Sequence, residues 1–176
     1  YAHIIEEEKK KGNLCCFLDI EGTCDLKYFQ KIGVNLDMLF LADPSNFKTS
    51  TVSGEEWLMF CSDLILSNQF GIIVLDSVAA LTPSAELQES WSNMMGKLSR
   101  MLSQGFRTIT TSLLKSDTGL ILLNQYRMNP NSMGNPYVEA GGEALKYYVA
   151  LKIELSKSLD KDKTTNEVLG GFVKAK

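Results

Sequence analysis

The sequence is poor in the residues that build thiol, imidazole and zinc sites. It has one histidine, His3, and four cysteines, none of them in a Cys-x-x-Cys motif. A Ser-His-Asp hydrolase needs a histidine that reaches a serine, and a Cys/His zinc site needs closely spaced ligand pairs. The sequence therefore argues against both kinds of site. The cysteine pattern indicates reduced thiols and a cytoplasmic protein rather than a disulfide framework.

Long apolar runs and a large charge of one sign are also missing. No run approaches the ~20 apolar residues of a membrane helix, and no signal peptide opens the chain, so no membrane partner is expected. The net charge is −3, from 18 basic and 21 acidic residues, so any contact with DNA must be local. What remains is a 176-residue chain with 44% hydrophobic residues, the composition of one soluble globular domain.

Short apolar runs alternate with helical patterns along the chain. Four runs predict strands that are buried on both faces: 14–18, 38–42, 72–75 and 120–124. Helical patterns lie between them, at 25–33, 53–67 and 83–115, the last long enough for a helix pair or for one helix with an irregular start. This alternation predicts an α/β fold, with a mostly parallel sheet flanked by helices.

Both ends of the chain lie within regular patterns. Residues 1–12 are typical of the tail of a helix, and residues 168–176 predict a strand. Residues 147–155 predict another strand, joined to the last one by a charged turn at 157–166. These ends favour a fragment of a longer gene over a short natural protein. We expect a single domain over residues 1–176 whose N-terminal part is missing.

Polar side chains follow three of the four apolar runs. They are Asp19 with Glu21, Asp76 with Ser77, and Asn124 with Gln125. In open parallel sheets, ligands bind beyond the carboxyl ends of the strands. An apolar strand that ends in Asp is the Walker B pattern of nucleotide sites, and Glu21 is a candidate to activate a water molecule. Each signal alone is more often a turn or cap residue, but the coincidence of three predicts a magnesium–phosphate site.

The glycine-rich cradle of a phosphate site is not visible. No G-x-x-x-x-G-K-[ST] motif is present, and the pairs Gly141-Gly142 and Gly170-Gly171 do not lie between a strand and a helix. A P-loop would belong just before a helix that leads into the strand at 14–18. Its absence fits the interpretation of the chain as a fragment.

Five segments carry a resemblance to one family. They are IIVLDSVAALTPSAEL (72–87), FLDIEGTCDLKYFQKIGVNLDMLFLADP (17–44), MGKLSRMLSQGFRTI (95–109), LLNQYRMN (122–129) and MGNPYVEAGGEALKYY (133–148). The chain resembles the bacterial RecA recombinase family over essentially its whole length, with the segment 72–87 similar to that family's Walker B segment. The resemblance implies a RecA-like P-loop NTPase core without its Walker A loop and C-terminal domain, and with ATP and Mg²⁺ as cofactors.

By matching position, the resemblance implies roles at the phosphates. Glu21 would be the general base for ATP hydrolysis. Asp76 would be the Walker B carboxylate that holds the metal, with Ser77 beside it at the nucleotide. Gln125 would sense the γ-phosphate and pass the signal to the loop that follows it.

The resemblance also implies contacts farther from the phosphates. Asp25 and Tyr28 would lie at the adenine, with the Tyr28 ring stacked on it. Lys174 and Lys176 would reach the nucleotide of a neighbouring subunit. The alternatives are a half-buried helix aromatic for Tyr28 and solvated strand-edge lysines for the pair.

Two segments, roughly 87–95 and 126–140, resemble the DNA-contacting loops of the family, and each is about one residue shorter than usual. Met95 and Met133 would wedge between base triplets, with Met133 in place of the usual aromatic; the alternative for a Met is a core filler. The resemblance extends DNA contacts to six further residues: Arg100, Arg107, Arg127, Asn135, Gly141 and Gly142. For the arginines, the alternative is solvated helix charge.

The function implied by the resemblance is DNA recombination and repair. Such a protein forms an ATP-dependent filament on single-stranded DNA and exchanges strands with homologous double-stranded DNA. Two alternatives stay open: a RecA-like ATPase with another motor or regulatory role, and a non-catalytic protein that binds partner subunits. The segment Leu81-Thr82-Pro83 and the loop at 133–142 favour the recombinase.

Overall fold

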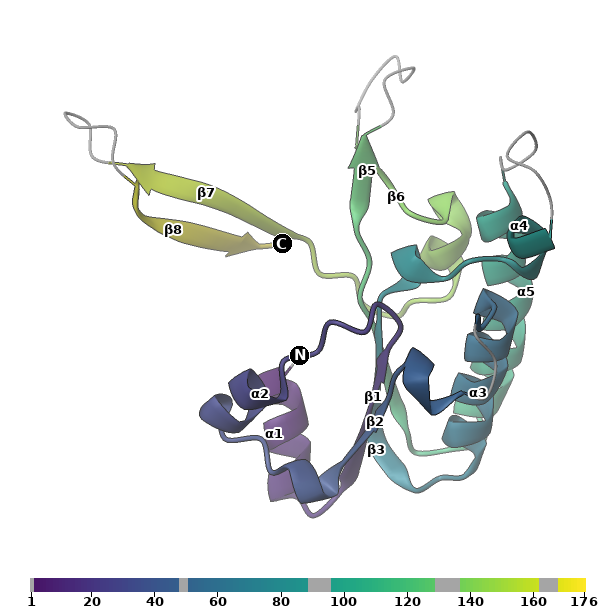
Figure 1. Ribbon diagram of the computed structural model, residues 1–176, viewed down its shortest axis with the longest axis horizontal. Helices are drawn as coiled ribbons and strands as arrows, with labels where there is room; N and C mark the ends of the chain where they lie inside the picture. Colours follow the sequence, from purple (N-terminus) through teal and green to yellow (C-terminus); the bar gives the residue numbers. More distant parts are fainter. Residues whose placement is uncertain (1, 48–50, 89–95, 129–136, 162–167) are drawn as a thin grey trace.

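A four-stranded parallel sheet forms the centre of the molecule. The computed structural model describes residues 2–47, 51–88, 96–128, 137–161 and 168–176. Figure 1 shows the sheet between its helices, and the strand order is β2-β1-β3-β4. Its strands are β1 (Leu14–Asp19), β2 (Leu39–Ala42), β3 (Phe70–Asp76) and β4 (Gly119–Leu122). The predicted α/β fold is confirmed, and each of the four apolar runs forms one of these strands.

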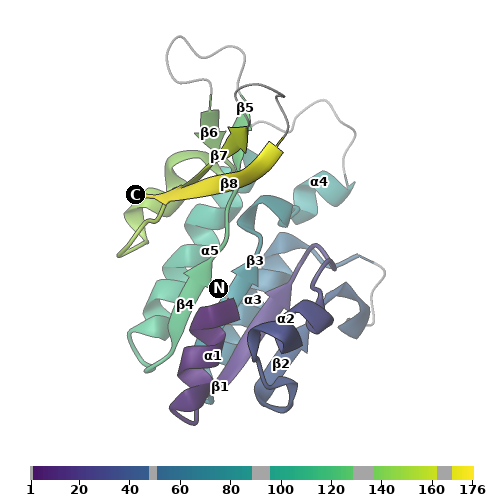
Figure 2. The same cartoon turned by 90° about the vertical axis from the view of Figure 1, so that its left-hand side faces the viewer.

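Helices cover both faces of the sheet, so the strands are apolar without alternation. The helices α1 (Ala2–Lys10) and α2 (Leu26–Ile32) lie on one face, as Figure 2 shows from their side. The helices α3 (Gly54–Leu66) and α5 (Lys97–Leu113) pack on the other face. Neighbouring Cys15 and Cys16 point to opposite faces, because Cys15 packs in the cluster with α1 and α2 and Cys16 in the cluster with α3 and α5.

The segment 83–115 forms a pair of helices rather than one helix with an irregular start. A short helix, α4 (Ser84–Gln88), precedes α5. Single turns of 3₁₀ helix lie elsewhere in the chain: η1 (Leu36–Met38), η2 (Pro44–Asn46) and η3 (Val78–Ala80). Within the described ranges, no helix combines the length and the apolar character that a membrane crossing requires.

Two antiparallel hairpins lie outside the central sheet. One pairs β5 (Tyr126–Met128) with β6 (Tyr137–Glu139), and the other pairs β7 (Leu155–Lys161) with β8 (Val168–Ala175). Figures 1 and 2 show both hairpins beyond the end of the sheet, and the β7–β8 hairpin extends away from the body of the molecule.

The strand predicted at 147–155 is wrong. The first residue of the predicted strand belongs to the 3₁₀ helix η5 (Gly142–Tyr147), and residues 151–154 have no regular structure. Strand β7 begins only at Leu155 and runs into the expected turn at 157–166. Cross-strand hydrogen bonds hold β7, and its described side chains are exposed. Polar and charged residues therefore fit it as well as apolar ones do, and no hydrophobic period marks it. The strand predicted at 168–176 is confirmed by β8.

The start of α3 gives a test of the fold. Ser53 and Glu56 form a reciprocal capping box, in which the Glu56 N–H donates to Ser53 Oγ (3.3 Å) and the Ser53 N–H donates to Glu56 Oε2 (2.7 Å). We expect Ser53→Ala to lower the free energy of unfolding by roughly 0.5–2 kcal/mol in urea titrations, because amides at the helix start lose their acceptor. Ser103→Ala, within α5, is the control. It should not lower the free energy of unfolding, because Ala is a better helix former than Ser. Equal losses in both variants would contradict the capping role.

Candidate functional site

The carboxyl ends of three strands meet at Glu21. In the β1–β3 register, Asp19 lies opposite Asp76, so the residues that follow both strands emerge side by side. Ser77 Oγ donates to Glu21 Oε1 at 2.6 Å, and Gln125 Nε2, from the segment after β4, donates to the same oxygen at 3.3 Å. The expected convergence is confirmed for Glu21, Ser77 and Gln125, and the roles assigned to them stay predictions. Asn124 does not join them, because its Nδ2 donates to the Ala140 carbonyl at 3.1 Å.

Backbone hydrogen bonds beyond the end of β4 bring Gln125 to this place. The Leu123 N–H donates to the Leu75 carbonyl (3.0 Å), and the Val78 N–H donates to the Leu123 carbonyl (2.8 Å). Pairing with the chain after β3 therefore continues past the last residue of β4. Gln125 follows two residues later and comes out beside the residues that follow β3.

Asp19 supports the turn that carries Glu21. Its side chain is buried, and its carboxylate accepts hydrogen bonds from the N–H groups of Thr23 (3.1 Å) and Cys24 (2.7 Å). A buried carboxylate that accepts two backbone donors fixes the shape of a turn. Asp19 is thus the turn residue that the alternative interpretation of this position described.

The cluster is electrostatically crowded. Burial, followed by the nearby charges of Glu21 and Asp19, raises the pKa of Asp76 above its ordinary value. Burial, followed by the neighbouring carboxylates of Asp19, Asp76 and Asp25, raises the pKa of Cys24 to about 11. The Cys24 thiol is therefore protonated at neutral pH and is a poor nucleophile, so the chemistry of the site belongs to its carboxylates.

The donor set fits a magnesium ion that is shared with a phosphate ligand. Mg²⁺ prefers oxygen donors and is commonly held by one or two carboxylates, with phosphate and water oxygens completing its shell. Asp76 and Ser77 offer a carboxylate and a hydroxyl of this kind. Among the described residues, no group of three or more His, Cys, Asp or Glu side chains is arranged to hold a metal ion alone.

Asp25 and Tyr28 lie together at the start of α2. The Asp25 carboxylate caps this helix by accepting from the N–H groups of Lys27 (2.9 Å) and Tyr28 (3.1 Å). The Tyr28 ring is 57% exposed and is therefore not the half-buried aromatic of the alternative interpretation. An exposed aromatic ring on a helix that follows the Glu21 turn is accessible for stacking on a flat ligand.

Lys174 lies on β8 and Lys176 directly after it, and both are exposed. The Lys176 N–H and carbonyl pair with the carbonyl and N–H of Glu154, each at 3.0 Å. This pairing extends the ladder of the β7–β8 hairpin by one rung. The end of β8 is therefore attached to the segment that leads out of the central fold.

Of the arginines predicted to contact DNA, two lie on α5 and one on β5. Arg100 and Arg107 are exposed and seven residues apart, so they share one face of the helix, roughly 10 Å apart along its axis. Arg127 instead donates from Nη2 to the Ala79 carbonyl at 2.8 Å. Its guanidinium ties β5 to the turn after β3, whereas the two on α5 face solvent.

Gly141 and Gly142 dock against the N-terminal half of α5. Both have left-handed backbone angles, with φ of 79° and 64°. Ser99 Oγ donates to the Gly141 carbonyl at 2.7 Å, and a Cβ atom at position 141 would lie 2.3 Å from Leu102 Cδ1. Close packing and φ both require glycine at 141. The glycine pair therefore lies beside the helix that carries Arg100.

Three residues predicted to contact DNA lie outside the described residues. They are Met95, Met133 and Asn135. Their assignments stay predictions from the resemblance.

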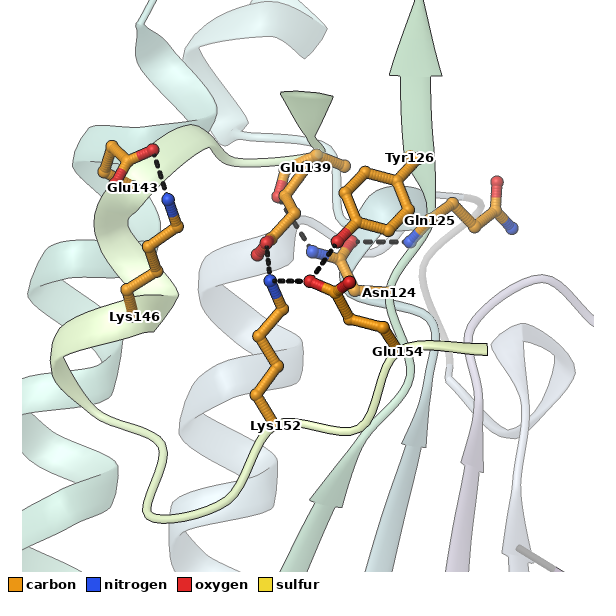
Figure 3. A network of polar contacts seen from close by, with 9 residues as sticks. Asn124, Gln125, Tyr126, Glu139, Glu143, Lys146, Lys152 and Glu154 are labelled. Atoms are coloured by element: carbon orange, nitrogen blue, oxygen red, sulfur yellow. Dashed lines mark hydrogen bonds and ion pairs between the residues drawn. The ribbon is translucent and has the colours of Figure 1, made fainter. Parts of the chain in front are cut away.

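The structure adds a polar cluster that the sequence analysis missed. Tyr126, Glu139, Lys152 and Glu154 contact one another at the base of the two hairpins (Figure 3). They come from three segments that are distant in sequence, so no local pattern announces them. The one available signal is the i,i+2 spacing of Lys152 and Glu154 in an extended segment, which puts both on the same side of the chain.

Comparison with known proteins identifies the family of the chain. The model of the RecA N-terminal domain family matches residues 1–176. The chain belongs to this family. It is 38% identical to Protein RecA of Cereibacter sphaeroides, over 99% of this chain and 49% of that protein. It is 40% identical to Protein RecA of Paramagnetospirillum magneticum and of Porphyromonas gingivalis, again over 99% of this chain and over 47% and 49% of those proteins. The chain thus spans about half the length of these curated relatives.

The raised pKa of Asp76 predicts a pH-dependent stability. In the window just above the ordinary pKa of Asp, the folded chain binds more protons at this group than the unfolded chain does, so its contribution to stability falls as the pH rises. We expect Asp76→Asn to be more stable than the wild-type chain in urea at pH 7, with the difference shrinking toward pH 4. A difference between the two that does not change with pH would contradict this assignment.

Proposed function

We propose that this chain is the ATP-hydrolysing, DNA-binding core of a recombinase that assembles on single-stranded DNA. The observation that carries the proposal is the Glu21 carboxylate, which accepts hydrogen bonds from both Ser77 and Gln125. One carboxylate oxygen of the candidate base, Glu21, thereby contacts both Ser77, which follows the Walker B strand, and the candidate sensor, Gln125. Membership of the RecA N-terminal domain family supports the proposal.

Glu21 acts as the general base in the proposed mechanism. A carboxylate that accepts two side-chain donors is held in one orientation, which is what the removal of a proton from an attacking water requires. Ser77 is buried and keeps its hydroxyl directed at Glu21, while Gln125 is exposed and able to turn toward a new partner. Gln125 would bond to the γ-phosphate in place of Glu21, and the backbone at the start of β5 would follow this change.

ATP and Mg²⁺ are the proposed cofactors. Asp76 and Ser77 would hold the cation, which neutralises phosphate charge when it is bound. The exposed Tyr28 ring would stack on the adenine near Asp25, and Lys174 and Lys176 would reach the nucleotide of a neighbouring subunit. The sequence has no P-loop motif, so the 176 residues alone should bind ATP weakly.

The proposed DNA surface is the region of α5, the Gly141–Gly142 turn and the β5–β6 hairpin. Arg100 and Arg107 present exposed charges on one face of α5, and the glycine turn packs against the same helix. Such a surface suits the phosphate backbone of single-stranded DNA, because separate guanidinium groups and backbone amides bind phosphate without reading bases. Exchange with double-stranded DNA would take place along the assembled filament.

A protein that carries this chain together with a Walker A segment tests the catalytic assignment. We expect Glu21→Gln to keep ATP binding and to slow ATP hydrolysis by roughly 10²–10⁴-fold, the usual contribution of a positioned base. Gln125→Ala should leave ATP bound while ATP no longer tightens DNA binding. Glu7→Gln, an exposed carboxylate on α1, is the control. Equal losses of ATP affinity in the Glu21 and Gln125 variants would overturn their separate roles.

The DNA surface has its own test in the same protein. Replacing Arg100 or Arg107 with Gln should weaken the binding of single-stranded DNA of every sequence. Each variant should also reduce the slope of log affinity against log salt by about 0.7 per lost phosphate contact. Lys115→Gln, just beyond the far end of α5, is the matched control and should leave the slope unaltered. An unaltered slope in both arginine variants would place the DNA surface elsewhere.

A further inference from the structure

Four side chains close a ring at the base of the two hairpins. Tyr126 and Glu139 are opposite one another in the β5–β6 ladder. Lys152 Nζ contacts Glu139 Oε1 and lies 2.7 Å from Glu154 Oε1, and the Tyr126 hydroxyl donates to Glu154 at 2.8 Å (Figure 3). Lys152 Nζ also lies 5.8 Å from the centre of the Tyr126 ring. The ring thus connects both strands of one hairpin with the segment that leads into the other.

The charges of the ring keep it closed at neutral pH. Hydrogen bonds to Glu139 and Glu154 raise the pKa of Lys152, and hydrogen bonds from Lys152 and Tyr126 lower the pKa of Glu154. The hydrogen bond to Glu154 also raises the pKa of the Tyr126 phenol, so the phenol keeps the proton that it donates. Lys152, Glu154 and Tyr126 are therefore each in the ionisation state that their contacts require.

The ring lies between the two ends of the proposed site. Gln125 directly precedes Tyr126 and donates to Glu21, and in Figure 3 its side chain points away from the ring. At the other end, the backbone of Glu154 is paired in both directions with Lys176. A continuous set of contacts thus runs from Glu21 through Gln125, Tyr126 and Glu154 to Lys176.

We propose that Tyr126 and Glu154 are positioning residues that couple the state of Gln125 to the position of the strand end bearing Lys174 and Lys176. Adjacent residues of an extended chain point to opposite sides, so a change at Gln125 that turns the backbone also moves the Tyr126 ring. Tyr126 moves Glu154, and Glu154 carries the last rung of the β7–β8 ladder. The purpose of this coupling rests on the proposed function. The coupling would link Glu21 of one subunit to Lys174 and Lys176, which would reach the nucleotide of the next subunit.

The test uses the 176-residue chain and NMR spectroscopy, without ATP or DNA. Gln125→Ala should shift the backbone amide resonances of Glu154 and Lys176. In a Tyr126→Phe background, which removes one hydroxyl from a side chain that is 46% exposed, the same substitution should no longer shift them. A tyrosine that only stabilises the fold would not abolish this transmitted shift.

Conservative and control variants sharpen the result. Glu154→Gln keeps an oxygen that accepts from Tyr126 and should retain the transmitted shift, whereas Glu154→Ala should lose it. Glu143→Gln removes a charge from the neighbouring Glu143–Lys146 pair of Figure 3 and should change nothing. A shift at Lys176 that persists in the Tyr126→Phe background, or that is absent from the Gln125→Ala chain itself, would overturn the coupling. A failure of ATP hydrolysis would leave this result untouched and would count only against the proposed function.

Discussion

The parallel register of β1 and β3 is the constraint on which the rest of the structure depends. It places Asp19 opposite Asp76, and the residues after both strands then meet at Glu21. Burial on both faces holds this register, because a slip by one residue would exchange the side chains between two different helical layers. Cys15 and Cys16 illustrate the point, since each packs into a separate cluster. The site is thus a consequence of how the core packs.

This register brings the negative charges of Asp19, Glu21 and Asp76 close together, which lowers the stability of the folded chain. Two backbone N–H donors stabilise the Asp19 carboxylate. Asp76 differs, because its partial burial and the nearby carboxylates of Glu21 and Asp19 raise its pKa. Crowding of this kind destabilises a folded chain in the absence of a ligand, and it is common where a site has to bind a cation or move a proton. The same charges that weaken the isolated fold are those that a bound magnesium ion would neutralise, so cation binding and folding stability would favour the same state.

The parts of the fold that the sequence predicts are those in which burial or backbone geometry restricts the residue type. The four strands consist mainly of apolar residues, with β1 and β3 the most buried. Ser53 and Glu56 mark the start of α3, and Gly33 ends α2 with a φ of 101°. The convergence at Glu21 was predictable because parallel strands bring their carboxyl ends to one edge. The resemblance, not the residue pattern, supplied the individual roles. Strand β7 and the ring of Tyr126, Glu139, Lys152 and Glu154 were missed because exposed residues carry no period and because ion pairs between distant segments leave no local signal.

The β7–β8 hairpin shows why exposed structure can still be specific. On one face it carries Leu155, Leu159 and Val173, all more than half exposed, and on the other face the exposed Phe172 lies beside Lys174. Exposed apolar groups beside charged ones are typical of surfaces that associate with another molecule, which fits the proposed assembly. Such a surface can bind another molecule specifically only if the hairpin is held in one orientation. Each contact of the ring at its base is weak when exposed to solvent, but four contacts that close on themselves restrain one another. The orientation of the hairpin therefore depends on Tyr126, the residue that directly follows Gln125.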